Sequence, residues 1–265
     1  MQVRPAAVAG SFYPLLTSKL VPMIKGYLKA AEVRQGTGNP PKAVIAPHAG
    51  YIYSGPTAAF SFSRLASEAS LIRRIVLLGP AHRVPVKGLA LPGAEGFETP
   101  LGVVPIDEGL VSRISSQSQV SVTATAHAAE HSLEVELPFL QVVLGEFSLL
   151  PILVGDTTPN EIAEVLDRVW GGVETRIVIS TDLSHYLGYS FARHIDQQTA
   201  DQIVGLQAAI SPRQACGAAA VNGLLVAARR RGLSSELLDL RNSGDTAGDK
   251  AQVVGYGAFA FHEWS

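Results

Sequence analysis

Short apolar runs recur along the chain, with mixed or helix-like segments between them. They occupy residues 42–46, 74–79, 148–155, 176–180 and 252–261. Because the runs are continuous rather than alternating with polar residues, they are typical of strands that are covered on both faces. Strands that alternate with helices predict an α/β protein, built as a three-layer α/β/α sandwich around a central sheet.

The segments between the runs carry helix signals. Four leucines have the spacing of one helix face: Leu133, Leu137, Leu140 and Leu144. Pro138 should kink or shorten that helix, because proline removes a backbone donor. Residues 160–170, NEIAEVLDRVW, are typical of a capped amphipathic helix. Ser211 followed by Pro212 predicts the N-cap and first residue of another helix.

Residues 84–107 are rich in Pro and Gly and contain short apolar pairs. This pattern predicts hairpin-like excursions, and therefore a mixed central sheet rather than a purely parallel one. The chain has 265 residues, of which 47% are hydrophobic, enough to bury one substantial core. We expect a single domain that spans residues 1–265.

Charge and cysteine usage exclude several classes of protein. A net charge of -2 and the lack of a basic cluster interleaved with aromatics argue against nucleic acid as a partner. The three arginines at 229–231 precede Gly232 and are typical of a helix C-terminus. A lone cysteine and a start without an apolar signal core predict a cytoplasmic protein. The sequence contains no uninterrupted run of about 18 apolar residues, so it predicts no membrane span.

Histidines follow three of the predicted strands. His48 comes after the first run, His82 after the second, and Asp182 with His185 after the fourth. Ligands of open α/β sheets bind outside the carboxyl ends of the strands. Each histidine alone is most simply a loop residue that caps a backbone carbonyl, but their matching positions favour one shared site. Two imidazoles and one anionic ligand would form the triad that holds non-haem iron(II).

Two further groups leave alternatives open. Glu130 and His131 stand before the leucine-faced helix, where they suit a capping carboxylate with a surface histidine as well as a pocket role. Cys216 lies in a small-residue segment, and its residue context favours a buried, inert thiol over a soft metal ligand. Motifs for serine hydrolysis, phosphate or dinucleotide binding and zinc proteolysis are absent from the sequence.

The order of the motifs resembles the Memo family along nearly the whole chain. The matching pieces are AGSFYP, IAPHAGYIYSG, LLGPAHRVP, ETPLG, EHSLEVELPFLQ, LPILVGD, STDLSHY, ACG and VGYGAFAF. That family is similar in fold to class III extradiol ring-cleaving dioxygenases, which bind non-haem iron(II) in a cleft at the edge of a mixed sheet.

The resemblance implies that His48 and His82 are metal ligands and that Cys216 stands where the dioxygenases place a carboxylate. It implies that His185 is the acid/base histidine. A thiolate is softer than a carboxylate, so copper or zinc could bind as well as iron(II). A thiolate beside iron is also exposed to oxidation, and ring cleavage does not follow from fold similarity alone.

Further residues of the cleft follow from the same resemblance. Asp182 and His131 would line it as catalytic residues, with Asp182 orienting His185 or a metal-bound water. Substrate would lie against Tyr13 and Tyr51 as aromatic walls, and Glu130 would also contact it.

The leading hypothesis is an iron(II)-dependent oxidoreductase of the extradiol dioxygenase type that acts on a small substrate. The rival is a module that binds a peptide, a phosphopeptide or a metal in the same cleft without turnover. Metal-assisted hydrolysis with a zinc-bound water is a third reading. The family resemblance also implies a pathway shared with radical SAM and AMMECR-type proteins in bacteria and archaea. An oligomer is compatible with the sequence.

Overall fold

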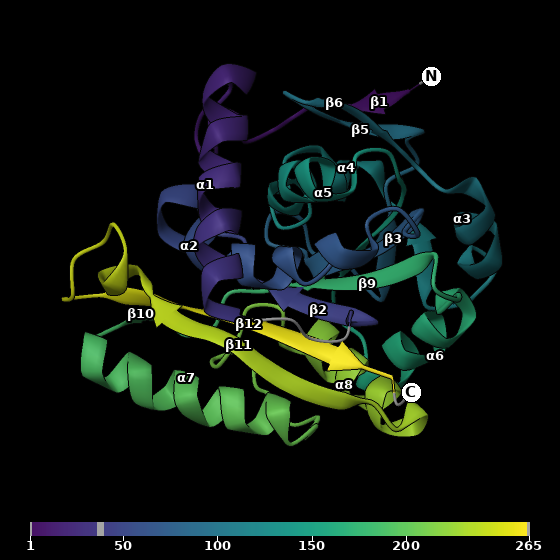
Figure 1. Ribbon diagram of the computed structural model, residues 1–265. Helices are drawn as coiled ribbons and strands as arrows, with labels where there is room; N and C mark the ends of the chain where they lie inside the picture. Colours follow the sequence, from purple (N-terminus) through teal and green to yellow (C-terminus); the bar gives the residue numbers. More distant parts are fainter. Residues whose placement is uncertain (1, 36–39, 264–265) are drawn as a thin grey trace.

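The computed structural model describes residues 2–35 and 40–263, and its centre is a large mixed sheet (Figure 1). The strands of this sheet are β2 (Ala43–Ala46), β3 (Arg74–Pro80), β4 (Leu89–Leu91), β7 (Val120–Val122), β8 (Ser148–Val154), β9 (Thr175–Ser180), β10 (His185–Leu187), β11 (Ser234–Asn242) and β12 (Val253–His262). Their order is β10-β12-β2-β9-β3-β8-β4-β7, and β11 also pairs with β12. The five apolar runs are all strands of this sheet, as predicted.

The sheet is mixed, as the sequence predicts. Strands β2, β9, β3 and β8 are parallel neighbours, whereas β12 runs antiparallel to β2, and β4 runs antiparallel to β8. The chain therefore delivers the carboxyl ends of its central strands to one edge, where a site can form.

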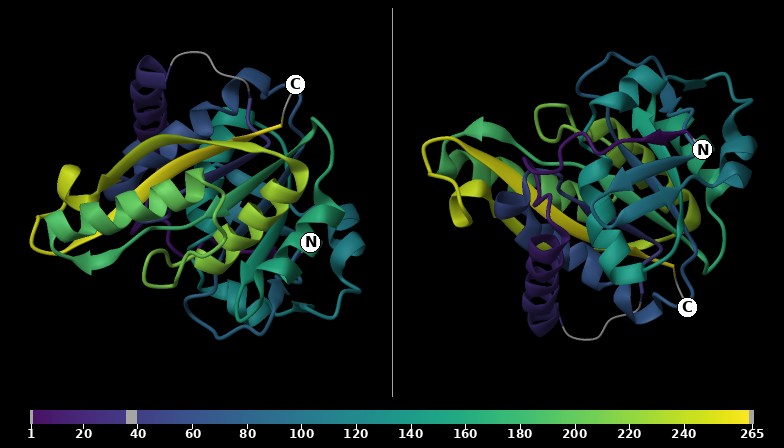
Figure 2. Two further views of the ribbon diagram at one scale, coloured as in Figure 1. Left: turned by 90° about the horizontal axis from the view of Figure 1, so that it is seen from below. Right: turned by 90° about the horizontal axis from the view of Figure 1, so that it is seen from above.

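Both faces of the sheet are covered by helices. On one face lie α1 (Thr17–Gln35), α2 (Tyr51–Ser63) and α5 (Leu137–Leu144); on the other lie α6 (Pro159–Val169), α7 (Tyr189–Val204) and α8 (Ala218–Arg231). In β2, Ala43 and Ile45 pack into one core, whereas Val44 and Ala46 pack into the other. This two-sided burial explains the continuous apolar runs and gives three layers. Figure 2 shows α7 running along β11 and β12.

Two predicted helix starts are refined by the structure. The helix predicted from Asn160 begins at Pro159, after a capping box in which Thr158 and Glu161 bond each other's backbone. The leucine-faced helix α5 is shortened as expected, because Pro138 lies in its first turn. A 3₁₀ turn, η2 (Glu134–Glu136), precedes it.

The helix start predicted at Ser211 and Pro212 is wrong. Helix α8 begins at Ala218, with Gly217 at its N-cap position. The Ser211 hydroxyl and backbone N–H both donate to the side chain of Gln214, which closes a turn instead. Cys216 consequently precedes the helix. The arginines at 229–231 do end α8, as predicted, before the left-handed Gly232.

The Pro- and Gly-rich segment 84–107 contains the predicted excursion. Strands β5 (Gly96–Thr99) and β6 (Gly102–Pro105) form an antiparallel hairpin, which joins β1 (Val3–Arg4) in a small separate sheet. The remaining elements are α3 (Glu108–Ile114), α4 (Ala124–Ala128), η1 (Ala66–Glu68) and η3 (Ser243–Asp245). None of the helices in the described residues is long and apolar enough to cross a membrane.

Candidate metal centre

Three adjacent parallel strands each end two residues before a polar side chain. His48 follows β2, Asp182 follows β9 and His82 follows β3, in the spatial order of the strands. The shared strand edge predicted from the sequence is therefore present. It brings these side chains together from segments that lie far apart in the chain.

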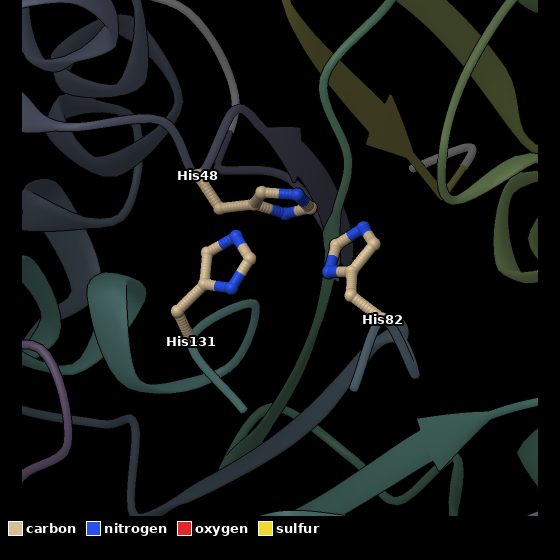
Figure 3. A group of neighbouring side chains, drawn as sticks. All are labelled: His48, His82 and His131. Carbon is tan, nitrogen blue, oxygen red and sulfur yellow. The ribbon is translucent and has the colours of Figure 1, made fainter. Parts of the chain in front are cut away.

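Three histidines form a group that could hold a metal ion. One ligand atom from each of His48, His82 and His131 lies within 4.8 Å of the others. Figure 3 shows the three rings gathered around a common space, with His131 arriving from the loop before η2. The centroids of the His48 ring and the His82 ring are 5.3 Å apart. His48 is buried, whereas the side chain of His82 is 29% exposed, so the group opens on one side.

Glu130 lies behind two of these rings. Its Oε1 accepts the backbone N–H groups of His131 and Ser132, and lies 3.0 Å from His82 Nδ1 and 3.1 Å from His131 Nδ1. Burial alone would raise the pKa of Glu130, but hydrogen bonds from His131, His82 and the backbone hold it well below its ordinary value. A carboxylate against Nδ1 leaves the Nε2 of His82 to face a metal.

His48 is the most enclosed member of the group. Its Nδ1 lies 2.7 Å from the Ser180 hydroxyl, and its backbone N–H donates to Asp182 Oδ1 at 2.9 Å. Burial lowers the pKa of His48 well below its ordinary value, and His131 and His82 lower it further. The ring is therefore neutral at physiological pH, which is the form that binds metal.

Cys216 lies beside the histidine group. Its Sγ is 3.4 Å from His48 Nε2 and accepts the Asp182 backbone N–H at 3.3 Å. Burial raises the pKa of Cys216 to about 12, and the Asp182 carboxylate acts in the same direction. Without a cation the side chain is a thiol, but a metal ion would remove its proton. Gly217 permits the close approach, since a Cβ there would lie 2.7 Å from Thr181 Cβ.

The centre opens into a cleft of about 840 Å³. His48, His82 and His131 line it together with Asp182 and His185. The lining also includes Ala49, Gly50, Arg83, aromatic rings and a polar loop: Phe12, Tyr53, Tyr186, Tyr256 and residues of the segment 243–254. A second cavity of about 400 Å³ borders His82 from another side and also reaches Cys216.

His185 reaches the cleft from the start of β10. Its Nδ1 lies 2.8 Å from the Leu183 carbonyl, so Nδ1 carries the proton and Nε2 is left to accept one. Burial lowers the pKa of His185 below its ordinary value. This arrangement suits a general base that faces bound substrate.

The contacts of Asp182 bear on one of the two roles expected for it, the orientation of His185. The Leu183 carbonyl, rather than Asp182, holds the His185 ring, while Asp182 accepts the backbone N–H of His48. Burial raises the pKa of Asp182 to about 7, against the lowering effect of that backbone bond. Asp182 thus fixes the turn that carries His48.

The structure places the residues expected to contact substrate outside the lining of the cleft. Tyr13 and Tyr51 are buried and absent from the cleft lining, because their hydroxyls donate to Glu134 and to the Val135 carbonyl. Glu130 is likewise absent from the lining, since it is engaged behind the histidines.

Sequence reasoning missed the aromatic rings that do line the cleft. Phe12 is the immediate neighbour of Tyr13, and Tyr53 lies two residues after Tyr51. The loop 243–254 was also missed, although its sequence SGDTAGDKAQVV, rich in Gly and Asp just before the last strand, was a usable signal.

Comparison with known proteins gives matches along almost the entire chain. The family model described as "Memo-like protein" matches residues 4–260. A MEMO1 family protein of Nitrosopumilus maritimus is 33% identical over 98% of this chain and 99% of its own length. A MEMO1 family protein of Aquifex aeolicus is 37% identical over 97% of this chain and 98% of its own length.

A solved structure is similar in fold alone. An uncharacterized protein of Escherichia coli K12 superimposes with a TM-score of 0.52 at 12% identity, over 81% of this chain and 98% of that one.

Proposed function

Because this chain belongs to the Memo-like protein family, we propose that it is a non-haem metalloprotein, an iron(II)-dependent oxidoreductase that acts on a small substrate in its cleft. The observation that carries the proposal is the convergence of His48, His82 and His131 at the strand ends. The similarity in fold between that family and the class III extradiol dioxygenases supports the iron(II) and the oxidative chemistry.

The donor set fits a divalent ion. Imidazole nitrogens suit iron, zinc and copper, and three of them on one side of an ion leave positions open for a substrate. Glu130 supplies the negative charge that such a cation needs nearby, and it is bonded to His82 as outer carboxylates are in metal sites. Cys216 offers a softer donor beside His48.

The residues of the cleft have separable roles. A bound iron(II) ion would supply the redox chemistry with dioxygen. His185 would take a proton from the substrate at Nε2, because its Nδ1 is held by the Leu183 carbonyl. The rings of Phe12 and Tyr53 would hold an aromatic or apolar substrate and exclude water from it.

Metal content tests the first part of the proposal. The protein is purified anaerobically and analysed for iron, copper and zinc, beside His48→Ala and the control His194→Ala. His194 lies on α7 and bonds only Gln198 in its described contacts, away from the histidine group. We expect near-stoichiometric metal in the wild type and the control, and loss in His48→Ala. Equal metal in all three proteins would overturn the proposal.

Oxygen consumption with a panel of catechols tests the second part. Loss of about 10²–10⁴-fold in turnover for His185→Ala, with metal content retained, is the size expected when a general base is removed. A metal-loaded protein that consumes no oxygen with any member of the panel contradicts the oxidoreductase assignment.

A second candidate function has its own observation. Tyr186 lines the cleft yet is 70% exposed, and an aromatic ring at an open rim suits the capture of a peptide side chain. Peptide binding without oxygen consumption, weakened by Tyr186→Ala, would favour a binding module over the enzyme.

A further inference from the structure

We propose that Glu136 is a positioning residue of the metal centre: as an uncharged acid it donates a hydrogen bond to Ser180, which fixes His48 with its proton on Nδ1 and its Nε2 free. The inference rests on the proposed metal-binding function and assigns a residue that this function has not used. Glu136 lies on η2, Ser180 is the last residue of β9, and His48 follows β2.

The argument begins with the three neighbours of the Ser180 hydroxyl. Its Oγ lies 2.5 Å from the carbonyl oxygen of Ser132, 2.7 Å from His48 Nδ1 and 2.8 Å from Glu136 Oε1. A hydroxyl has one proton to donate and two lone pairs that accept. Each of the three contacts needs a proton between its two atoms.

The Ser132 carbonyl decides where the hydroxyl proton goes. A carbonyl oxygen only accepts, and two oxygens cannot lie 2.5 Å apart without a proton between them. Ser180 therefore donates to Ser132. Its two lone pairs are left to accept, one from His48 Nδ1 and the other from Glu136.

Both remaining neighbours must then be donors. His48 carries its proton on Nδ1, which leaves the Nε2 lone pair for a metal. Glu136 carries a proton on its carboxyl group, since a carboxylate would set its lone pairs against those of the Ser180 oxygen. The Ser180 oxygen is then fully satisfied by one donated and two accepted hydrogen bonds.

The surroundings of Glu136 agree with an uncharged acid. The residue is completely buried, and its Oε2 has no hydrogen-bond partner among the described residues. Arg4 pairs with Glu134, two residues before Glu136. Burial raises the pKa of Glu136 well above its ordinary value, and the Asp182 carboxylate acts in the same direction. A charged carboxylate there would lack compensation.

Glu130, which contacts His82, and Glu136, which contacts His48 through Ser180, therefore act on these two histidines differently. Glu130 presents a carboxylate to His82, which makes that imidazole a stronger donor toward a metal. Glu136 presents a neutral acid through a hydroxyl to His48, so that ligand is oriented without added negative charge.

The experiment uses the metal-free protein and three variants, Glu136→Gln, Glu136→Leu and Ser180→Ala, each checked for folding by circular dichroism. Infrared spectroscopy at neutral pH looks for the carbonyl band of a buried protonated carboxyl group. Nitrogen-15 chemical shifts report the tautomer of His48. Titration with zinc then gives the affinity.

We expect Glu136→Gln to remove one component of the carboxyl band, while the component from Asp182, whose pKa is about 7, remains. The variant should keep both the tautomer and the zinc affinity, because an amide N–H can replace the acid proton. Ser180→Ala should mix the tautomers and weaken zinc binding by about 10–100-fold. Glu136→Leu should keep the tautomer, because the Ser132 carbonyl still takes the Ser180 proton, but weaken zinc binding by about tenfold, because the Ser180 oxygen loses one of its three anchors. If Glu136→Leu fails to fold, Ser180→Ala carries the same test. A carboxyl band that Glu136→Gln leaves unchanged, or a Ser180→Ala protein with unchanged tautomer and affinity, would overturn the proposal.

Failure of the proposed function looks different. A wild-type protein that binds no metal removes that function, while the infrared band and the His48 tautomer in the metal-free protein still decide the protonation of Glu136.

Discussion

The Sγ atom of Cys216 lies 3.4 Å from Nε2 of His48, the ring nitrogen left free by the bond to Ser180. His131 stands on another side of the same ring, with ring centroids 5.4 Å apart. His48 therefore has two candidate partner ligands beside it, the Cys216 thiol and the His131 imidazole, of which only the imidazole belongs to the group of three mutually close ligand atoms. The choice of third ligand depends on the softness of the metal.

We predict that the two candidate third ligands affect different metals. Cys216→Ser should weaken zinc or copper(I) binding by at least tenfold and iron(II) binding less, because a thiolate is preferred by soft ions. His131→Ala should weaken iron(II) binding more. Anaerobic competition titrations with all three metals measure both effects. Equal losses for every metal in both variants would contradict this division.

We predict that Tyr13→Phe lowers stability without affecting the metal. The Tyr13 hydroxyl donates to buried Glu134 at 2.6 Å, so its removal should cost about 1–3 kcal/mol of unfolding free energy. Urea denaturation measures the loss, and metal titration should be unchanged. Tyr53→Phe is the control at the cleft, where stability should change little. A Tyr13→Phe protein with normal stability and weakened substrate binding would restore the aromatic-wall interpretation.

We predict that Asp196 makes stability depend on pH. Burial raises the pKa of Asp196 to about 6 from an ordinary value of 3.8. Between pH 3.8 and about 6 the folded chain holds more protons than the unfolded chain. The contribution of Asp196 to folding stability is therefore fully present below this pH range and is lost as pH rises through it. In Asp196→Asn that loss should disappear. Thermal melting across this pH range compares the two proteins, and parallel curves would count against the prediction.

We predict that Gly223 is required where α8 packs on α6. A Cβ at Gly223 would lie 2.3 Å from Ile162 Cγ2, so Gly223→Ala should cost about 1–3 kcal/mol through overpacking. Gly26 in α1 has nothing within 4 Å of its Cβ position, and Gly26→Ala should stabilise by about 0.5–1 kcal/mol. Chemical denaturation of both variants separates helix propensity from packing; a loss in both would point to another cause.

The sheet could be predicted because burial on two faces leaves a direct mark on composition. In β2 every residue is apolar, since alternate side chains enter different cores. Because His48 and His82 follow two of these predicted strands, the sequence alone predicted that both lie at the same edge of the sheet. The helix start predicted at Ser211 failed because a local motif does not reveal which groups its side chains bond. The Ser211 hydroxyl and backbone N–H donate to the Gln214 side chain and close a turn instead of a helix cap.

The aromatic lining could not be assigned because neighbouring rings point in different directions. Tyr51 and Tyr53 lie two positions apart on α2, where each residue turns by about 100°, so one faces the core and the other the cleft. The residue context of His131 did not place it with the strand-end histidines, because it arrives from the loop before η2, and only the family resemblance predicted it in the cleft. Its proximity depends on long-range packing alone.

His48, Asp182 and His82 each lie two residues after the end of one of three adjacent strands. The spacing of the strands therefore sets the spacing of these residues in the candidate centre. With β9 between them, β2 and β3 hold the His48 and His82 backbones about two strand spacings, ~10 Å, apart. An ion bound there would lie between side chains whose separation is set by the central strands. Its binding would require little ordering of the backbone, and every variant that keeps the sheet would keep this separation.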